Sequence, residues 1–585
     1  MFIYTNPMTE LQFDYQFYIR LYNDVWLAGI RTRMAAYRHW LMVGRFQQRI
    51  VSASQVTINH LRMCQFDAKQ YESTLTNKPS WTSPQEAFCH WILHRPLTMT
   101  IPYPFAQQSV VTPKRMRLGV VVTTHGPNSA YVRQCIASYY RCIPSACDMH
   151  LILYINETTD VEQSMYNKWF PKIKVVHISD QTQNGGLTGT WNQGIEWCVK
   201  KQCNYVLLSN DDLIVTSSLR YMLDAARKCQ STTDTLCYFG PVTNNPGPSS
   251  LNKIQYATQP LEQSSMATRS NPLNGFCMLF PIHVLEANRL NDREYFDVSK
   301  PFGGNEVEWA TRLFAKYENA FAVVVPQTFV YHTKLASWRK SDVNQHVCTY
   351  TINTGGYENN ILFDKTSFDH PVFYFTDNES TMIQAIQKGF IPMHTDVYHY
   401  DSLVSTPNAY QIQRFLKTSP HLILPTNYTT SIYLDGNLIP DSDAFRHILE
   451  EYKSSPDIHL VCWTHPKNKS IREEAKLVKK NSLETPENVD SLLDQLDMYG
   501  YTKEKDNVLT ETNVLIRRHD QLKTFAVAWA KAVNLCRRDQ LSFDFLVRHL
   551  KVSHKQHAYE DKPVKKVKHS GNIRTRIIHT FPINT

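Results

Sequence analysis

The stretch from residue 184 to residue 212 decides the fold of the domain that contains it. Its first part, NGGLTGTWNQGIEW (residues 184–197), is a glycine-broken loop that leads into a helix, because Trp191, Ile195 and Cys198 recur with helical spacing. Its second part, NYVLLSNDD (residues 204–212), is a short apolar run that is typical of a buried strand. The stretch therefore predicts a loop, a helix and a strand with an Asn-Asp-Asp triplet at its C-terminal end.

The triplet Asn210, Asp211 and Asp212 suggests a ligand site. In open α/β sheets, ligands bind outside the carboxyl ends of the strands, so acidic residues there are placed to hold one. Two adjacent carboxylates repel each other, and a divalent cation between them and a phosphate offsets that repulsion. The alternative is an Asn-Asp-Asp turn that only caps the following helix.

Together the loop and the strand end resemble the family 2-like glycosyltransferases, which have the nucleotide-sugar-binding GT-A fold. Asn184, Gly186, Asn192 and Gly194 stand at the family's two Asn-x-Gly positions, and Trp191 replaces a basic residue of the family. The triplet stands where the family has Asp-x-Asp. The resemblance implies that Asp212 binds Mn²⁺ or Mg²⁺ and that a nucleotide-sugar donor is contacted by Asn184, Gly186, Asn192, Asn210 and Asp211.

The chain before this stretch alternates strand and helix. Residues 118–124 and 150–155 are predicted strands, with a predicted helix over residues 129–141 between them. This alternation indicates a parallel sheet. The resemblance implies that Thr123 and Asn156, at the ends of the two strands, contact the base and the ribose of the donor.

Two acids after the stretch, Glu306 and Glu308, fall in the first turn of a predicted helix that follows a Gly-Gly pair. The helix dipole favours acids at this place whether or not they are catalytic. The resemblance implies that Glu306 is the catalytic base, with Glu308 beside it as a second catalytic candidate. It also implies that His332, after the last predicted strand, completes the metal site.

A second α/β pattern begins near residue 371. A predicted strand over residues 431–434 ends at Asp435, and the run Arg537-Arg538-Asp539 precedes a further apolar segment. Two arginines beside an aspartate can be a salt-bridge cluster without a catalytic role. Alternatively, they can neutralise a leaving diphosphate while the acid orients a sugar.

This half resembles the glycosyltransferase-like domain of plant cell-wall and mucilage proteins. The matching segments are residues 414–421, 433–436, 465–466, 474–475, 511–514 and 537–543. The resemblance implies a GT-A-like fold in which Asp435 contacts the donor and binds the metal. It also implies that Arg538 contacts the donor and that Asp539 is catalytic.

An internal repeat occupies the N-terminal 100 residues. Phe-Asp pairs at residues 13–14 and 66–67 are each followed, at similar spacing, by a His-Trp pair that starts at His39 or His90. Each copy predicts two short helices, with the histidines in the core or hydrogen-bonded rather than bound to metal. The first copy resembles a small helical module that flanks bacterial and viral glycosyltransferases.

Composition sets broader limits on the chain. Its 585 residues suggest roughly three to five domains, and 42% hydrophobic and 20% charged residues are typical of a folded protein. Part of the net charge of +9 comes from a C-terminal tail that we interpret as solvated, and no nucleic-acid partner is expected. Thirteen cysteines without paired zinc spacing predict reduced thiols and a cytoplasmic location. No signal peptide or membrane span is predicted, so any membrane contact is expected to be peripheral.

The patterns predict an α/β protein preceded by a small all-α repeat module, and the two resemblances imply that its α/β part is two GT-A-like (Rossmann-like nucleotide-sugar-binding) domains in tandem. The expected parts are helical modules over 1–100, a linker over 101–117, a family 2-like domain over 118–340, a linker over 341–370, and a second domain with a basic tail over 371–585. The expected activity is transfer of sugars from nucleotide-sugar donors to a glycan or glycoprotein acceptor, with inversion in the first domain. The alternatives are one active domain beside a non-catalytic glycan- or nucleotide-binding domain, and a nucleotidyltransferase.

Overall fold

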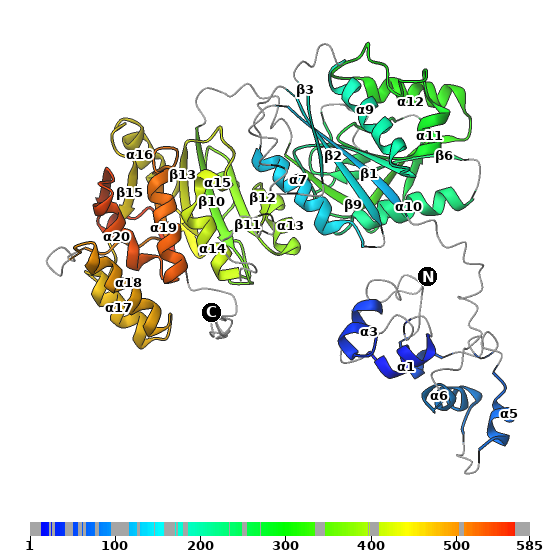
Figure 1. Cartoon of the computed structure of the whole chain (residues 1–585), viewed down its shortest axis with the longest axis horizontal. Helices are drawn as coiled ribbons and strands as arrows, with labels where there is room; N and C mark the ends of the chain where they lie inside the picture. The colour runs from blue at the N-terminus through cyan, green and yellow to red at the C-terminus, as the bar shows by residue number, and fades with distance from the viewer. Residues whose placement is uncertain are drawn as a thin grey trace. The chain divides into compact units, whose positions relative to one another are not determined.

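The fold is taken from a computed structural model, which divides into two compact units, Met1–Arg115 and Met116–Thr585 (Figure 1). Each unit is described by itself. The structure describes residues 13–22, 25, 30–40, 51–56, 61, 66–75, 81–94, 116–125, 129–145, 147–156, 166, 170, 173–178, 185–232, 235–247, 254–269, 271–333, 346–395, 397, 409–501 and 508–567.

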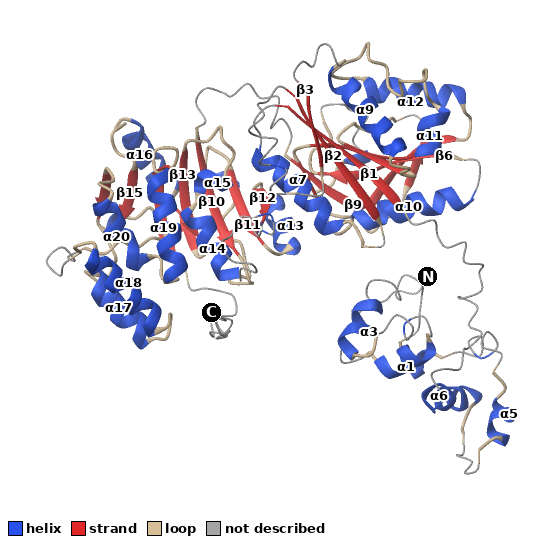
Figure 2. Cartoon of the chain, in the orientation of Figure 1, coloured by secondary structure: helices blue, strands red, loops and turns tan. Residues whose placement is uncertain are grey.

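The N-terminal unit is helical in its described parts (Figure 2). The described residues of this unit include the helices α1 (Tyr15–Leu21), α3 (Arg33–His39), α5 (Ala68–Ser73) and α6 (Pro84–His94). Asp14 and Asp67 cap α1 and α5, since a carboxylate oxygen of each accepts backbone N–H groups of the first turn. Phe17, Tyr18 and Phe88 are fully buried in one apolar cluster. The expected helices are present in the described residues, whereas the repeat relation between the two copies stays a prediction.

The second unit contains two large sheets (Figure 2). The first has the order β3-β2-β1-β4-β8-β6-β9-β5, with β7 paired to β9. Strands β3, β2, β1 and β4 run parallel, and β8 is antiparallel to β4. The bounds are β1 (Arg117–His125), β2 (Asp148–Asn156), β3 (Lys174–Ile178), β4 (Tyr205–Asn210), β5 (Leu213–Val215), β6 (Leu236–Thr243), β7 (Met266–Thr268), β8 (Cys277–Pro281) and β9 (Ala320–His332).

Helices cover both faces of this sheet, as Figure 1 shows. On one face, α7 (Ser129–Cys142) and α10 (Leu219–Thr232) pack on the side chains of one set of alternating strand residues. On the other face lie α9 (Gly186–Lys200), α11 (Ile282–Ala287) and α12 (Asn305–Lys316). Helix α9 lies so close to β1 that a Cβ on Gly194 would overlap the side chain of Val121. Gly194, the glycine of the second Asn-x-Gly motif, is therefore needed for the packing of α9 on β1.

The second sheet has the order β12-β11-β10-β13-β16-β15-β17. Its strands are β10 (Val347–Asn353), β11 (Val372–Thr376), β12 (Ile391–His394), β13 (Thr430–Asp435), β15 (Leu460–Trp463), β16 (Val514–Arg518) and β17 (His554–His557). The helices of this half are α13 (Glu379–Gln387), α14 (Ala409–Thr418), α15 (Pro420–Ile423), α16 (Ser442–Lys453), α17 (Ile471–Lys480), α18 (Pro486–Met498), α19 (Lys523–Leu535) and α20 (Gln540–His549).

Two segments of the second half differ from the expectation. Residues 347–353 were expected in a linker, but they form the fully buried strand β10 near the middle of the sheet. Residues 564–566 were expected in a solvated tail, but they form β18 (Val564–Lys566), which pairs with β14 (Leu438–Pro440) just after Asp435. We call residues 562–567 the strap.

The two sheets have the same topology. The order β3-β2-β1-β4-β8-β6-β9 corresponds strand by strand to β12-β11-β10-β13-β16-β15-β17. In both sheets the first four strands are parallel, the fifth is antiparallel to the fourth, and the last two are parallel to each other. Strands β4 and β13 are therefore equivalent, and so are helices α12 and α20, which precede the last of these strands. The α/β expectation for both halves is confirmed.

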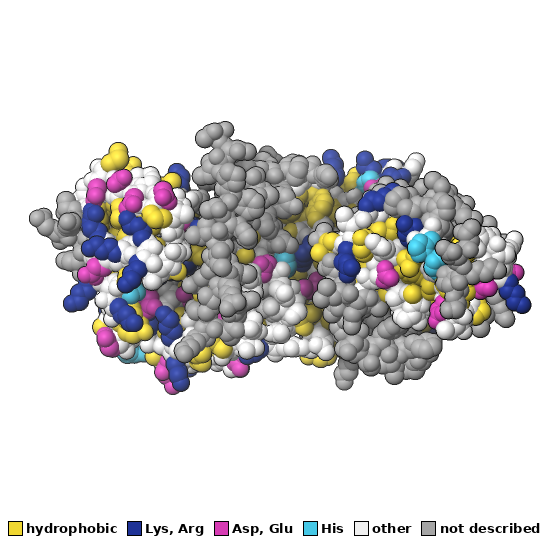
Figure 3. Space-filling view, turned by 90° about the horizontal axis from the view of Figure 1, so that it is seen from below, with side chains coloured by type: hydrophobic (Ala, Val, Ile, Leu, Met, Phe, Trp, Pro, Cys, Tyr) yellow, Lys and Arg dark blue, Asp and Glu magenta, His cyan; other side chains and the backbone are white. Residues whose placement is uncertain are grey.

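One face of the described part is mixed in charge. On the face that Figure 3 shows, Lys and Arg side chains are interspersed with Asp and Glu side chains. Among the described residues, no helix combines the length and the apolar character needed to cross a membrane.

Candidate functional site

The C-terminal edge of the first sheet brings the predicted polar residues together. In the strand register, Thr123 of β1 lies beside Asn210 of β4, and Asn156 ends β2 next to the last residue of β1. Asp211 and Asp212 follow directly and are almost fully buried. The predicted strand end therefore lies at the edge where α/β sheets bind ligands.

The adjacent aspartates point in different directions. Thr124 Oγ1 donates a hydrogen bond to Asp211 Oδ2 at 2.5 Å, which holds this carboxylate against β1. Asp212 Oδ1 instead lies 3.4 Å from His332 Nε2 at the end of β9. This separation relieves the repulsion between neighbouring carboxylates and leaves Asp212 to pair with an imidazole.

The loop after β6 fixes His332. Its Nδ1 lies 2.7 Å from the carbonyl oxygen of Asn245, which can only accept, so Nδ1 carries the proton and Nε2 faces Asp212. Asn244 accepts a hydrogen bond from the backbone N–H of His332 and donates one to its carbonyl oxygen. Although burial alone would lower the pKa of His332, the Asp212 carboxylate raises it.

A carboxylate and an imidazole nitrogen that face each other are ligands that divalent metal ions accept. Asp212 and His332 therefore fit Mn²⁺ or Mg²⁺ as a pair of protein ligands. In the part of the chain that the structure describes, no group of three or more His, Cys, Asp or Glu side chains is arranged to hold a metal ion. Further ligands would have to come from a bound molecule or from water.

Glu306 lies at the same edge. It is in the first turn of α12, and a Cβ on Gly275 would lie 3.5 Å from its carboxyl carbon. The next residue, Phe276, accepts a hydrogen bond from Asn210 N at 2.9 Å and stacks on the His332 ring. Burial raises the pKa of Glu306, although backbone N–H groups of Glu306 and Gly275 partly offset this.

Glu308 differs from Glu306 in its contacts. Its carboxylate forms an ion pair with Arg312 Nε at 2.9 Å. Asn305, where the family has an acid, donates a hydrogen bond from its side chain to Thr188. Of the two candidate bases, Glu306 is the one held by backbone N–H groups rather than by an arginine.

The predicted donor loop is only partly described. Asn184 lies outside the described residues. Gly186 has φ 64°, and a Cβ there would lie 2.7 Å from Pro301 O. The Asn192 side chain is used inside the chain, since Oδ1 accepts from the backbone of Tyr295 and Phe296. Asn156 Oδ1, in contrast, is buried and has no hydrogen-bond partner among the described residues.

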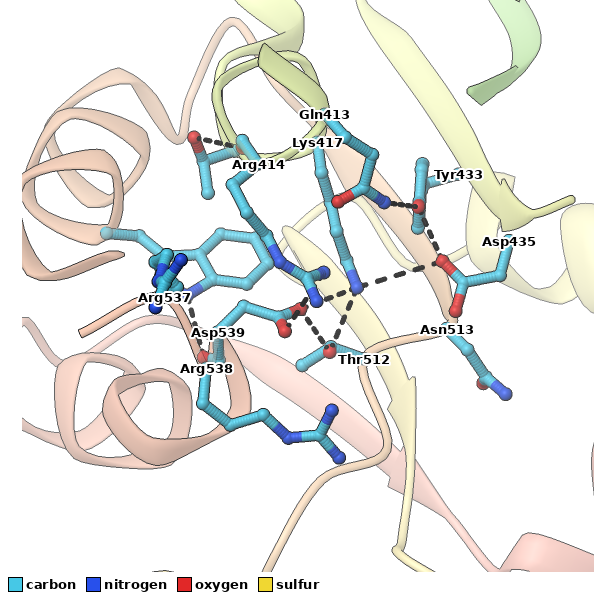
Figure 4. A network of polar contacts seen from close by, with 12 residues as sticks. Gln413, Arg414, Lys417, Tyr433, Asp435, Thr512, Asn513, Arg537, Arg538 and Asp539 are labelled. Atoms are coloured by element: carbon cyan, nitrogen blue, oxygen red, sulfur yellow. Dashed lines mark hydrogen bonds and ion pairs between the residues drawn. The ribbon is translucent and has the colours of Figure 1, made fainter. Parts of the chain in front are cut away.

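In the second sheet, Asp435 ends β13 as Asn210 ends β4, and Asp539 is the N-terminal cap residue of α20, the helix equivalent to α12. Asp539 is only 2% exposed, and both carboxylate oxygens are engaged (Figure 4). Oδ1 lies 3.1 Å from Arg414 Nη1, while Oδ2 lies 2.6 Å from Lys417 Nζ and accepts from Thr512 Oγ1 at 2.7 Å. Although burial alone would raise the pKa of Asp539, Arg414 and Lys417 hold it well below its usual range.

The two arginines of the motif pair with other acids. Arg537 pairs with the buried Glu484, and Arg538 pairs with Glu474 at 2.9 Å. The sequence did not indicate these partners, which come from α17 and the segment after it. It gave no local signal for Arg414 or Lys417 as partners of Asp539 either, because both come from α14.

Asp435 has a different environment from Asp212. Tyr433 Oη donates a hydrogen bond to its Oδ1 at 2.5 Å, and Lys417 Nζ lies 4.0 Å from the same oxygen. An ammonium beside a carboxylate already supplies positive charge, so a divalent cation fits Asp435 less well than it fits Asp212 and His332. The metal role of Asp435 stays a prediction.

Comparison with known proteins gives two family matches within the chain. Residues 119–280 match the family model described as Glycosyl transferase family 2, and residues 373–571 match the one described as TOD1/MUCI70, glycosyltransferase-like domain. The chain carries two glycosyltransferase-type domains. Both family resemblances of these halves are thus confirmed, whereas neither match reaches the N-terminal repeat. No curated protein sequence matches the chain.

Solved structures with a similar arrangement are distant. GalNAc-T7 with UDP, GalNAc and Mn²⁺ is 11% identical with a TM-score of 0.30, covering 37% of this chain and 44% of that chain. S. aureus TarS 1-349 is 16% identical with a TM-score of 0.29, covering 38% of this chain and 61% of that chain. The chain thus spans less than two thirds of each of these structures.

Proposed function

We propose that the chain is a bifunctional glycosyltransferase, in which each domain transfers a sugar from a nucleotide-sugar donor to a glycan or glycoprotein acceptor. The observation that carries the proposal is the first sheet edge, where Asp212, His332 and the half-buried Glu306 converge around residues 275–276. The equivalent edge of the second sheet also carries acids, Asp435 and Asp539.

In the first domain, Asp212 and His332 would hold Mn²⁺ or Mg²⁺. When bound, the cation would neutralise charge on the leaving diphosphate. Thr123 and Asn156 would contact the base and the ribose, which the unpartnered buried Asn156 Oδ1 supports. The donor site would be shaped by the backbone segments that contain or contact Gly186, Asn192, Asn210 and Asp211. Asn184 would contact the donor directly.

Glu306 would accept the proton of the acceptor hydroxyl as that oxygen attacks the anomeric carbon. The new bond forms opposite the leaving diphosphate, so the configuration is inverted. A half-buried acid whose pKa is raised by its partial burial suits this role, because a base is most effective when its pKa approaches the working pH. Glu308, which is paired with Arg312, would orient the start of α12.

In the second domain, Asp435 and Arg538 would contact the donor. Asp539 would either act on the sugar or hold the side chains of Arg414 and Lys417 in place. The ion pairs of Asp539 favour a second candidate, in which this domain binds donor or glycan without turnover. The free cysteines of the described part support a reducing, cytoplasmic location, with peripheral contact to membranes where an acceptor lies there.

The test is donor turnover by the full chain, measured as nucleotide release with and without Mn²⁺. Asp212→Asn should lower the Mn²⁺-dependent rate at least 100-fold, because one of two protein ligands loses its charge. Glu318→Gln, which changes an exposed acid beyond α12, is the control and should stay within twofold. Full Mn²⁺-dependent turnover by Asp212→Asn would refute the assigned site.

A further inference from the structure

Asp435, at the end of β13, has the buried ammonium group of Lys417 beside it. Lys417 Nζ lies 2.6 Å from Asp539 Oδ2, donates to Thr512 Oγ1 at 3.1 Å and lies 4.0 Å from Asp435 Oδ1 (Figure 4). The ring of Tyr433 lies 4.9 Å from the same ammonium. Lys417 therefore sits between an enclosed carboxylate and one that is about a third exposed.

Lys417 cannot move away from this place without loss of buried contacts. Its side chain is only 2% exposed, and side chains on a helix lean toward the helix N-terminus, here toward the C-terminal edge of the sheet. Its carbonyl oxygen accepts hydrogen bonds from Arg517 at 2.9 Å and from Tyr350 Oη at 3.1 Å. Contacts therefore hold both the backbone carbonyl group and the side-chain ammonium group of Lys417 in place.

This fixed ammonium changes what Asp435 can bind. A divalent cation on Asp435 would lie close to a buried like charge, and such repulsion is weakly screened away from water. At Asp212 the neighbouring group is instead an imidazole, whose Nε2 can present a lone pair to a metal ion. The two equivalent strand ends therefore differ in the group that faces the acid, an imidazole at Asp212 and an ammonium at Asp435.

The strap brings further positive charge to the same edge. Val567 N donates to Asn437 O, and Lys562 Nζ donates to Asn513 Oδ1 at 2.9 Å, while Asn513 O accepts from the backbone N–H of Asp435. Lys562 and Lys566 share one acid, Glu511, so the trio keeps a net charge of +1. The Lys566 side chain is 51% exposed and can turn toward a bound anion.

On the transferase function proposed above for the second domain, we infer that this domain binds the diphosphate of its donor without a divalent cation. Lys417 supplies fixed positive charge behind Asp435, and Lys566 of the strap contacts the phosphates. Asp435, with Oδ1 engaged by Tyr433, accepts hydroxyl groups of the donor sugar through Oδ2.

The test is calorimetric titration of the full chain carrying Asp212→Ala, which removes one of the two metal ligands proposed for the first domain. The probes are UDP, GDP, ADP, CDP and dTDP, each in EDTA and in Mn²⁺. At least one should bind with a Kd that agrees within twofold between the two conditions. Lys566→Gln in this background should weaken binding about tenfold, which is the loss expected for one charge-assisted contact to phosphate.

Lys565→Gln is the matched control, because this exposed neighbour points to the other face of β18 and should leave the Kd within twofold. Lys417→Met should abolish binding in EDTA and restore it in Mn²⁺, because Asp435 and Asp539 then lack the ammonium between them. A melting curve checks that this variant folds. If it does not fold, the Lys566 and Lys565 variants decide the role of the lysines.

The outcomes separate the inference from the proposed function. Binding that appears only in Mn²⁺ would overturn the metal-independent site and leave a second transferase domain in place. Equal affinity of the Lys566 and Lys565 variants would overturn the role of the strap. No binding of any probe in either condition would overturn the donor-binding role of the domain, and the inference with it.

Discussion

Glu306 and Asp539 show how the environment of one residue decides its chemistry. Both lie at the start of equivalent helices, α12 and α20. Burial raises the pKa of Glu306, whereas Arg414 and Lys417 hold the pKa of Asp539 far below its usual range despite burial. A carboxylate with a raised pKa can take a proton from a hydroxyl, while one fixed by two cations stays ionised and positions them.

We predict that Glu306→Gln lowers transfer to the acceptor by about 10²–10⁴-fold, as loss of a general base does. Donor affinity should stay within twofold, because the base acts on the acceptor side. Glu308→Gln is the control and should cost less than tenfold, since Glu308 is paired with Arg312. Because Glu306 must be ionised, the first-domain rate should fall as pH drops through its raised pKa. Unchanged transfer by Glu306→Gln, measured with separated products, would move the base elsewhere.

The sequence could identify Asp212, His332 and Glu306 as candidates because their places after a strand or at a helix start match the motifs of the family 2-like glycosyltransferases that this half resembles. It could not identify Lys417 as the partner of Asp539, since more than a hundred residues separate them and nothing near Lys417 signals the pairing. Asn192 illustrates a different limit. The sequence of an Asn-x-Gly motif does not show whether its side-chain amide contacts a ligand or another part of the chain. Here the amide oxygen accepts hydrogen bonds from the backbone of Tyr295 and Phe296.

At the scale of elements, β10 was missed for a physical reason. Its sequence, VCTYTIN, mixes polar and apolar residues, and a polar run beside glycines is typical of a linker. In the structure two of these polar side chains have nearby partners, since Thr349 Oγ1 lies 2.8 Å from His370 Nε2 and Asn353 Nδ2 donates to Glu358 O. Such partners make buried threonines and asparagines compatible with a strand inside the sheet, although the buried Thr351 Oγ1 has no hydrogen-bond partner in the described part.

Helix α20 carries a buried acid whose ionisation should affect stability. Asp544 accepts hydrogen bonds from the backbone N–H and Oγ1 of Thr510, and burial raises its pKa to about 6. A raised pKa in the folded state means that stability is greatest below the unfolded pKa of about 3.9 and falls as pH rises through about 6.

We therefore predict that Asp544→Asn raises the melting temperature of the second domain at pH 7.5 relative to wild type, with little difference near pH 4. The amide keeps an acceptor for the Thr510 N–H and removes the buried charge. The gain at high pH should not exceed about 3 kcal/mol. Melting curves at both pH values decide this, and a variant destabilised equally at both would show that the carboxylate is needed for its hydrogen bonds alone.

At the scale of the whole molecule, the chain contains one sheet topology twice, with different charges at equivalent places. The first edge pairs Asp212 with an imidazole, and the second pairs Asp435 with Lys417. On the function proposed above, the two domains would therefore hold chemically similar donors under different metal conditions. The tandem arrangement was predictable from two separate strand–helix alternations, whereas the difference in charge required the three-dimensional contacts.

The N-terminal unit has its own apolar cluster and should not be needed for chemistry. A chain that begins at residue 105 should keep donor turnover within twofold and show the same melting transitions for the remaining domains. Nucleotide release and calorimetry measure both quantities. A shortened chain that folds but does not turn over the donor would show that the helical unit contributes to the active domains.

The strap also delays the completion of the second domain during protein synthesis. Leu438 pairs with Lys566, so β14 must wait until nearly all of the second domain has left the ribosome before it meets its partner. Every strand of the first sheet has by then been synthesised. The first domain can therefore complete its sheet on the growing chain, while Glu511 stays without its lysine partners until translation has passed the strap.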